Sequence, residues 1–200
     1  DLFSSEVDRL WCDDPATFGR IVQFVQTYMP RLRSRIQLYD GAEPIFDHFR
    51  IEPQIERALE RKVWLKSGGY LVFDQAEALT AIDVNTGRFV GKKSQDETVL
   101  RTNLEAVDEV VRQLRLRNIG GIIIVDFIDM TRDADRKRVS EALKEQLRRD
   151  KARTSALKIS ELGLVQMTRK RTRESLEELL TETCPRCQGR RVVKSVPTLA

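Results

Sequence analysis

An apolar stripe at steps of three and four residues predicts a helix over residues 14–28 near the start of the chain. Its members are Phe18, Ile21, Val22 and Val25. Asp14 suits the N-cap of this helix, Pro15 suits its first position, and Pro30 ends it. A second stripe of the same period predicts a short helix over residues 51–60.

From about residue 62 the pattern changes to strands that alternate with helices. Two apolar runs joined by a polar link predict a hairpin over residues 70–74 and 79–84, which residues 88–92 extend. A helical stripe covers residues 97–116, and the unbroken apolar run 122–128 predicts a buried central strand. The remaining predicted elements are a helix over 133–150 with Val139, Leu143 and Leu147 inward, strands near 157–159 and 164–168, and a short helix over 174–182. This order is typical of an α/β (α+β) layer.

Composition places the chain among globular proteins that have a strongly charged surface. Of its 200 residues, 40% are hydrophobic and 33% are charged, which excludes a disordered chain. The sequence holds no apolar run long enough for a membrane span, and its start does not resemble a signal peptide. It also lacks an initial Met, so we expect a section of a longer protein.

The net charge of +4 is modest, but the basic residues are clustered. Such clusters at element ends favour contact with nucleic-acid phosphates, although each could also be an ordinary solvated face. The clusters are Arg31, Arg33 and Arg35; Arg112, Arg115 and Arg117; and Arg169, Lys170, Arg171 and Arg173.

Two carboxylates follow apolar strand runs and carry the main chemical hypothesis. Asp83 and Asp126 would meet at one sheet edge if their strands are neighbours, and Asn85 would share the face of Asp83. Two acids and an amide suit Mg²⁺, which takes one or two carboxylates and a substrate phosphate. The alternative is that both acids cap strands or pair with arginines. Asp129 would lie on the opposite strand face in a supporting role.

The three cysteines indicate a reduced, cytoplasmic protein, and the single histidine excludes most His-based catalysis, leaving a Ser-His-Asp triad only if His48 itself serves. Cys184 and Cys187 form a CxxC in which Pro185 and Gly189 shape a turn typical of zinc knuckles. A closed zinc site needs four ligands, so we expect two chains to share one Zn²⁺; a redox-active CxxC is the alternative. Cys12 is expected to be a bystander and His48 to be structural.

Several stretches of this sequence closely resemble the ribonuclease E/G family, and their residues are nearer to those of its G branch than to those of its E branch. The match is very specific over residues 62–192 and looser over residues 1–61. The matching stretches are AIDVNTG at 81–87, TNLEA at 102–106, RQLRLR at 112–117, GGIIIVDFIDM at 120–130, GLVQMTRKR at 163–171 and the closing CPRC.

The resemblance implies a Mg²⁺-dependent endoribonuclease that cleaves single-stranded AU-rich RNA, leaving a 5′-phosphate and a 3′-hydroxyl. Asp83 and Asp126 match the family's metal ligands, Asn85 its positioning residue, and Cys184 and Cys187 the half of a zinc site that joins a homodimer. The basic residues Arg112, Arg115, Arg117, Arg169, Lys170 and Arg171 would hold the RNA. The family also implies roles in rRNA maturation and mRNA decay.

By the same resemblance, residues 1–61 are the later part of an RNase H-like subdomain. Residues 62–182 form a DNase I-like catalytic subdomain, and residues 183–200 form a zinc-link segment. The family's S1 domain and 5′-monophosphate sensor are not found in this sequence. The alternative function is therefore a dimerising RNA-binding scaffold that is catalytically incomplete.

Overall fold

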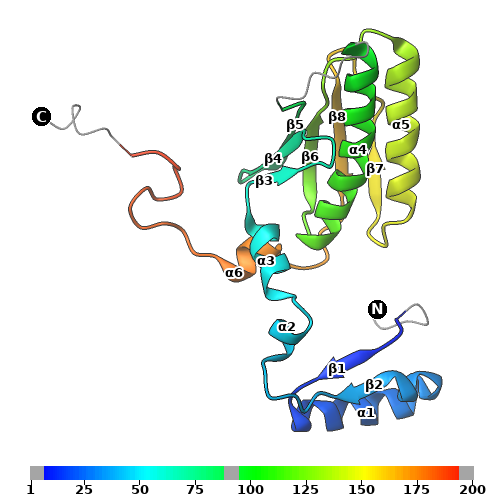
Figure 1. Ribbon diagram of the computed structural model, residues 1–200, viewed down its shortest axis with the longest axis vertical. Coiled ribbons are helices and arrows are strands. Elements are labelled where there is room, and N and C mark those ends of the chain that lie inside the picture. The colour runs from blue at the N-terminus through cyan, green and yellow to red at the C-terminus, as the bar shows by residue number, and fades with distance from the viewer. Residues whose placement is uncertain (1–6, 88–94, 194–200) are drawn as a thin grey trace, which may run out of the picture. The chain divides into compact units, whose positions relative to one another are not determined.

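The computed structural model describes residues 7–87 and 95–193 (Figure 1). The chain divides into two compact units, an N-terminal unit over Asp1–Ile55 and a C-terminal unit over Glu56–Ala200. The predicted extension of the hairpin at residues 88–92 lies outside the described residues. Within the described ranges, no helix is both long and apolar enough to cross a membrane.

The N-terminal unit is built on two short parallel strands and one long helix. Asp14 caps that helix as predicted, because its carboxylate accepts a 2.7 Å hydrogen bond from the Thr17 backbone N–H. The basic stretch after Pro30 forms a 3₁₀ helix. The elements are β1 (Leu10–Cys12), α1 (Pro15–Tyr28), η1 (Pro30–Arg35), β2 (Ile36–Leu38) and α2 (Ile45–His48), followed by α3 (Glu52–Leu59), which runs into the C-terminal unit.

A mixed six-stranded sheet forms the centre of the C-terminal unit, with the order β3-β4-β5-β6-β8-β7. Only β5 and β6 run parallel, because the long helix α4 connects them as a crossover. The predicted hairpin is confirmed as the antiparallel pair β4 and β5. The strands are β3 (Lys62–Trp64), β4 (Tyr70–Gln75), β5 (Leu79–Asn85), β6 (Gly121–Asp126), β7 (Thr154–Ala156) and β8 (Leu164–Arg169).

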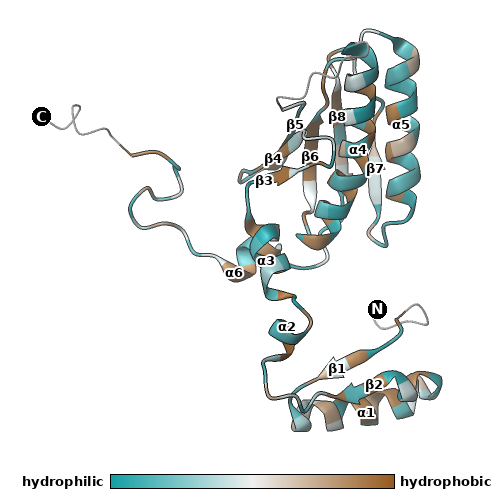
Figure 2. Ribbon diagram, in the orientation of Figure 1, coloured by the Kyte–Doolittle hydropathy of each residue, from teal (hydrophilic) through white to brown (hydrophobic). Residues whose placement is uncertain are grey.

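Two helices, α4 (Gln95–Leu116) and α5 (Asp133–Arg148), pack side by side against one face of this sheet (Figure 1). Their inward residues and the strand residues facing them make one core, and Val139, Leu143 and Leu147 of α5 are buried in it as predicted. Figure 2 shows apolar residues along the strands and polar residues on the outer sides of both helices. The short helix α6 (Leu176–Leu180) begins at Ser175 with a capping box.

The other face of the sheet stays largely open in the described structure. Along β5, Thr80, Ile82 and Val84 are buried, whereas Asp83 between them is exposed. The prediction of a buried central strand is therefore only half right. β6 is central, but it ends at Asp126 and buries only its helix-facing residues, while Ile122 on the other face is 50% exposed.

The strand predicted near residues 157–159 lies earlier, at residues 154–156. Its register pairs Thr154 with Arg169 and Ala156 with Met167. The connection to β8 then turns back, with the Ser160 N–H donating to the Leu164 carbonyl at 2.9 Å. The apolar residues at 157 and 159 misled the prediction, because short apolar runs do not encode pairing register.

Candidate active site

Asp83 and Asp126 lie side by side on the open face of the sheet. They are paired residues of the adjacent parallel strands β5 and β6, at the point where β6 ends. Asn85 follows two residues later on the same face, and its Nδ2 donates a 2.7 Å hydrogen bond to Oδ2 of Asp83. The expected juxtaposition of the three side chains is confirmed, and their chemical roles stay predictions.

A hollow of about 480 Å³ surrounds the paired acids. Its wall includes Asp129, contrary to the prediction that this residue lies on the opposite face of the strand. The parity argument failed because β6 ends at Asp126, so residues 127–129 no longer alternate across a strand. The sequence analysis therefore failed to place Asp129 beside the paired acids. The full lining is Asp83, Val84, Asn85, Thr86, Asp126, Phe127, Ile128, Asp129, Leu162 and Leu164.

The electrostatics of the hollow favour a cation. Partial burial raises the pKa of Asp126 above its ordinary value, and the negative charges of Asp83 and Asp129 raise it further. Holding two ionised carboxylates side by side is therefore electrostatically unfavourable, and a bound cation would reduce their repulsion.

Buried polar contacts hold the segment after β6 in place. Asn103 is fully buried on α4, where its Nδ2 donates to the Ile128 carbonyl at 2.8 Å and its Oδ1 accepts from the Ile128 N–H at 3.0 Å. Gly163 has φ +77°, and a Cβ there would meet the Phe127 carbonyl oxygen at 2.6 Å. Both residues fall within the family-like stretches, but a positioning role was not predicted for either.

A close backbone approach also positions Asn85. A Cβ on Gly69, in the turn between β3 and β4, would lie 2.7 Å from the Asn85 carbonyl oxygen. The same turn is tied to α4, since the Ser67 N–H donates to the Glu105 carboxylate at 3.1 Å. The glycine pair of this turn therefore supports the site as well as linking two strands.

The donor set fits a hard divalent ion better than a soft one. Oxygen ligands from two carboxylates suit Mg²⁺, which keeps several waters and uses few protein ligands. Over the described parts of the chain, no three His, Cys, Asp or Glu side chains converge as a ready-made metal cage. That arrangement would be demanded by a closed zinc or calcium site, but not by Mg²⁺ between two acids.

The predicted RNA-binding residues divide into exposed and buried groups. Arg112, Arg115, Lys170 and Arg171 have exposed side chains, although Arg112 also pairs with Glu109 at 2.8 Å. For Arg117 and Arg169 the structure gives a different role, because both are buried.

The buried pair of arginines is bonded inside the C-terminal unit. Arg117 donates to the Gln113 amide and the Glu60 carbonyl and lies over the Phe73 ring at 4.4 Å. Burial lowers the pKa of its guanidinium. Arg169 forms an ion pair with Asp150 and donates to the Ile119 carbonyl at 2.8 Å. Phosphate contact is therefore proposed below only for the four exposed residues.

The CxxC forms a tight turn, in which the Gln188 N–H donates to the Cys184 carbonyl at 2.8 Å. Backbone N–H groups of Cys187 and Arg186 also donate to the Cys184 sulfur, which holds the pKa of this thiol below its ordinary value. The turn leaves the Cys184 side chain exposed, and a thiol with a lowered pKa more readily loses its proton to become a metal ligand. Cys12 and His48 lie in the N-terminal unit, where His48 bonds to Glu43 at 2.7 Å.

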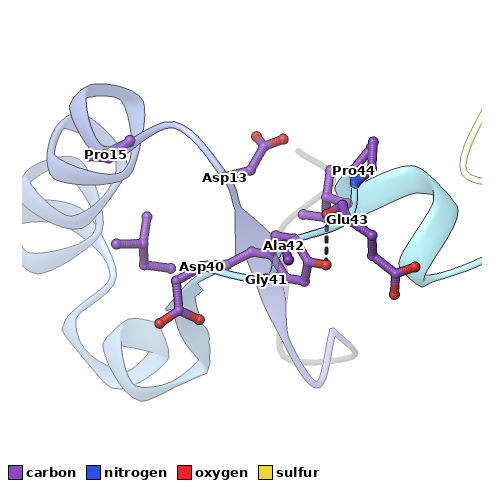
Figure 3. A pocket seen from close by; sticks show the side chains of 10 residues that line it. Asp13, Pro15, Asp40, Gly41, Ala42, Glu43 and Pro44 are labelled. Atoms are coloured by element: carbon purple, nitrogen blue, oxygen red, sulfur yellow. Dashed lines mark hydrogen bonds between the residues drawn. The ribbon is translucent and has the colours of Figure 1, made fainter.

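A second hollow, of about 470 Å³, lies in the N-terminal unit beside the turn after β2 (Figure 3). Its wall includes Asp13, Asp40 and Glu43, but Figure 3 shows their carboxylates pointing in different directions. The Tyr39 hydroxyl donates to the Glu43 carbonyl and closes the turn. These side chains do not converge on a common point, so we assign them no chemistry.

The sequence of this chain is similar to those of known ribonucleases over its whole length. The model of the family described as Ribonuclease E/G matches residues 1–172. Ribonuclease G of Escherichia coli (strain K12) is 51% identical over 199 residues, covering 100% of this chain and 41% of that protein. Ribonuclease G of Haemophilus influenzae is 46% identical, covering 100% of this chain and 40% of that protein. Ribonuclease E of Escherichia coli is 42% identical over 201 residues, covering 100% of this chain and 19% of that protein. The chain therefore spans less than half the length of these relatives.

Proposed function

The chain belongs to the ribonuclease E/G family, and we propose that it forms the catalytic region of a Mg²⁺-dependent endoribonuclease. The observation that carries this proposal is the pairing of Asp83 with Asp126 beside Asn85 in one hollow. The substrate is single-stranded AU-rich RNA, and the products carry a 5′-phosphate and a 3′-hydroxyl. The cellular roles that follow are rRNA maturation and mRNA decay.

Each acidic or amide side chain has a role that follows from its place. Asp83 and Asp126 would hold Mg²⁺ through carboxylate oxygens, and Asn85 fixes the orientation of the Asp83 carboxylate through its hydrogen bond. When bound, the ion supplies Lewis-acid chemistry that activates a water and neutralises charge on the phosphodiester. Hydrolysis adds the water's hydroxyl to phosphorus and its proton to the 3′-oxygen. Because the ion would activate the water, no histidine base is needed.

The subdomain assignments extend the same proposal. Residues 62–182 would be the DNase I-like catalytic subdomain, residues 1–61 the later part of an RNase H-like subdomain, and residues 183–200 the zinc link. The exposed basic residues Arg112, Arg115, Lys170 and Arg171 would contact RNA phosphates.

Incubation of the full chain with a 5′-phosphorylated AU-rich RNA tests the activity directly. We expect endonucleolytic products that require Mg²⁺ and disappear in EDTA, read on a denaturing gel with end-labelled RNA. Binding without cleavage would instead support the alternative of a catalytically incomplete RNA-binding scaffold. Cleavage that is equally fast in EDTA would contradict the metal-dependent mechanism.

For the CxxC we propose a Zn²⁺ ion shared by two chains in a reduced, cytoplasmic compartment. Cys184 and Cys187 of each chain would give two of four thiolates. We expect native mass spectrometry to find one zinc per dimer, and Cys184→Ser to give zinc-free monomer. Cys12→Ser is the matched control and should leave the zinc dimer intact. A zinc-free dimer, a zinc-bound monomer or reversible thiol oxidation without zinc would contradict the shared site.

A further inference from the structure

An aromatic pair, the exposed Trp64 and the half-buried Tyr70, lies on the same open sheet face as the paired acids. We propose that Trp64 and Tyr70 form a platform on which a base of single-stranded RNA stacks while a neighbouring phosphate lies at Asp83 and Asp126. This inference rests on the proposed ribonuclease function and adds a specific contact to it.

Strand register places the platform relative to the acids. Trp64 of β3 pairs with Tyr70 of β4, and Tyr70 pairs with Asn85 of β5, so the three residues form one cross-strand row. Directly paired residues of adjacent strands point to the same face of a sheet. The row that contains Trp64 therefore ends at the amide that bonds to Asp83.

A second row runs parallel to the first and joins a cation to the acids. Lys62 pairs with Val72, Val72 with Asp83, and Asp83 with Asp126. Neighbouring strands lie about 4.8 Å apart, so the backbone of Tyr70 lies about 5 Å and that of Trp64 about 10 Å from the strand that carries Asn85. A base adjacent to a phosphate at the acids can reach that distance.

The side chains of the platform have the properties of a stacking surface. Trp64 is 63% exposed, and its ring lies 5.4 Å from the Tyr70 ring at an angle of 61°. The Lys62 ammonium lies 3.9 Å from the Trp64 ring centre and 3.6 Å from that of Tyr70. Aromatic rings combined with a cation are the surface that single-stranded nucleic acid uses, since bases stack on the rings and phosphates meet the cation.

Trp64 contacts Tyr70 and Lys62 within its own unit but still leaves 63% of its surface exposed on the edge strand β3. An exposed aromatic side chain on an edge strand is available for contact with another molecule. A protein partner could also cover such a residue. The shared rows with Asn85 and Asp83 favour RNA instead, because they join the platform to the proposed cleavage site.

Tryptophan fluorescence gives a direct readout of stacking. The chain has two tryptophans, so Trp11→Phe leaves Trp64 as the reporter. We expect an AU-rich single-stranded oligonucleotide, added in EDTA to prevent cleavage, to quench this fluorescence. An oligonucleotide that is abasic at the stacked position should bind about tenfold more weakly and quench little.

The corresponding protein variants complete the test. Trp64→Ala should weaken RNA binding about tenfold, and Trp64→Phe should retain most of the affinity. The Trp64→Ala variant should bind the abasic and the intact oligonucleotide equally well, because the ring on which the base stacks is gone. Tyr28→Ala removes an aromatic that is 70% exposed in the N-terminal unit, and it should leave binding unchanged. Cleavage by Trp64→Ala should show a raised KM with kcat retained.

Failure of the platform differs from failure of the proposed function. If Trp64→Ala binds RNA normally and its parent shows no quenching, the platform is wrong, and Mg²⁺-dependent cleavage by the unmodified chain would still uphold the proposed function. A change in sedimentation without a change in RNA affinity would assign Trp64 to a protein contact and also overturn it. If the unmodified chain neither binds nor cleaves RNA, the proposed function fails as well.

Discussion

Asp83→Asn is expected to lower Mg²⁺-dependent RNA cleavage by on the order of a thousandfold, and Asp126→Asn to do the same. Each change removes one of the two carboxylates proposed to hold the metal, whose charge stabilisation is worth several kcal/mol. The measurement is the single-turnover rate on a 5′-phosphorylated AU-rich RNA at saturating protein. Asp8→Asn, which changes an exposed acid of the N-terminal unit, is the matched control and should cleave normally.

The same variants should keep their fold, which separates lost chemistry from lost structure. Burial and the charges of Asp83 and Asp129 raise the pKa of Asp126, so the folded state holds this proton more tightly than the unfolded state. The stability that the protonated carboxyl contributes is therefore lost as the pH rises through the raised pKa. At neutral pH without metal, Asp126→Asn should melt no lower than the unmodified chain. Normal turnover by either variant would refute the assignment of the metal ligands.

Asp150→Ala is expected to destabilise the chain by about 3–5 kcal/mol, because it leaves the Arg169 guanidinium buried without its partner. The side chains of Arg169 and Asp150 are only 5% and 3% exposed, and Nε of Arg169 lies 2.7 Å from the carboxylate. Urea unfolding measures the effect. Asp133→Ala breaks an exposed pair with Lys137 and should change stability by no more than about 1 kcal/mol.

The ion pair between Asp150 and Arg169 also predicts a pH dependence with a definite sign. Burial by itself raises the pKa of Asp150, but the bonds from Arg169 and the Ala152 N–H outweigh it and leave the pKa lowered. The pair's stabilisation is therefore present above the ordinary pKa of aspartate and is lost as the pH falls through the lowered value. Asp150→Ala should flatten this acid limb. An acid limb as steep as that of the unmodified chain would contradict the assignment.

Arg169 illustrates why a basic residue cannot be assigned to RNA from its neighbours in sequence. It stands beside Lys170 and Arg171 in one basic run, yet it is the last residue of β8 and faces the core, while the next two are exposed. Arg117 differs from Arg112 and Arg115 in the same way. Replacing Arg169 should therefore lower the free energy of unfolding rather than weaken RNA binding.

Local periodicity was sufficient for most of the elements. The helices over 14–28, 97–116 and 133–150 and the hairpin of β4 and β5 were predictable, because side-chain spacing and caps act within a few residues. The positions of Asp83 and Asp126 after two apolar strand runs were also predictable from the local pattern. Their juxtaposition needed only the rule that a helical crossover joins parallel neighbours.

What the sequence by itself determined is the family, the order of the elements and the identity of the acid pair with Asn85. Only the tertiary structure decided that the sheet is covered on one face, that Asp129 lines the hollow, that Arg117 and Arg169 are buried, and that Trp64 shares a row with Asn85. The physical reason is that these features depend on pairing register and on which face the helices cover. Residues far apart in the chain set both, and no local pattern records them.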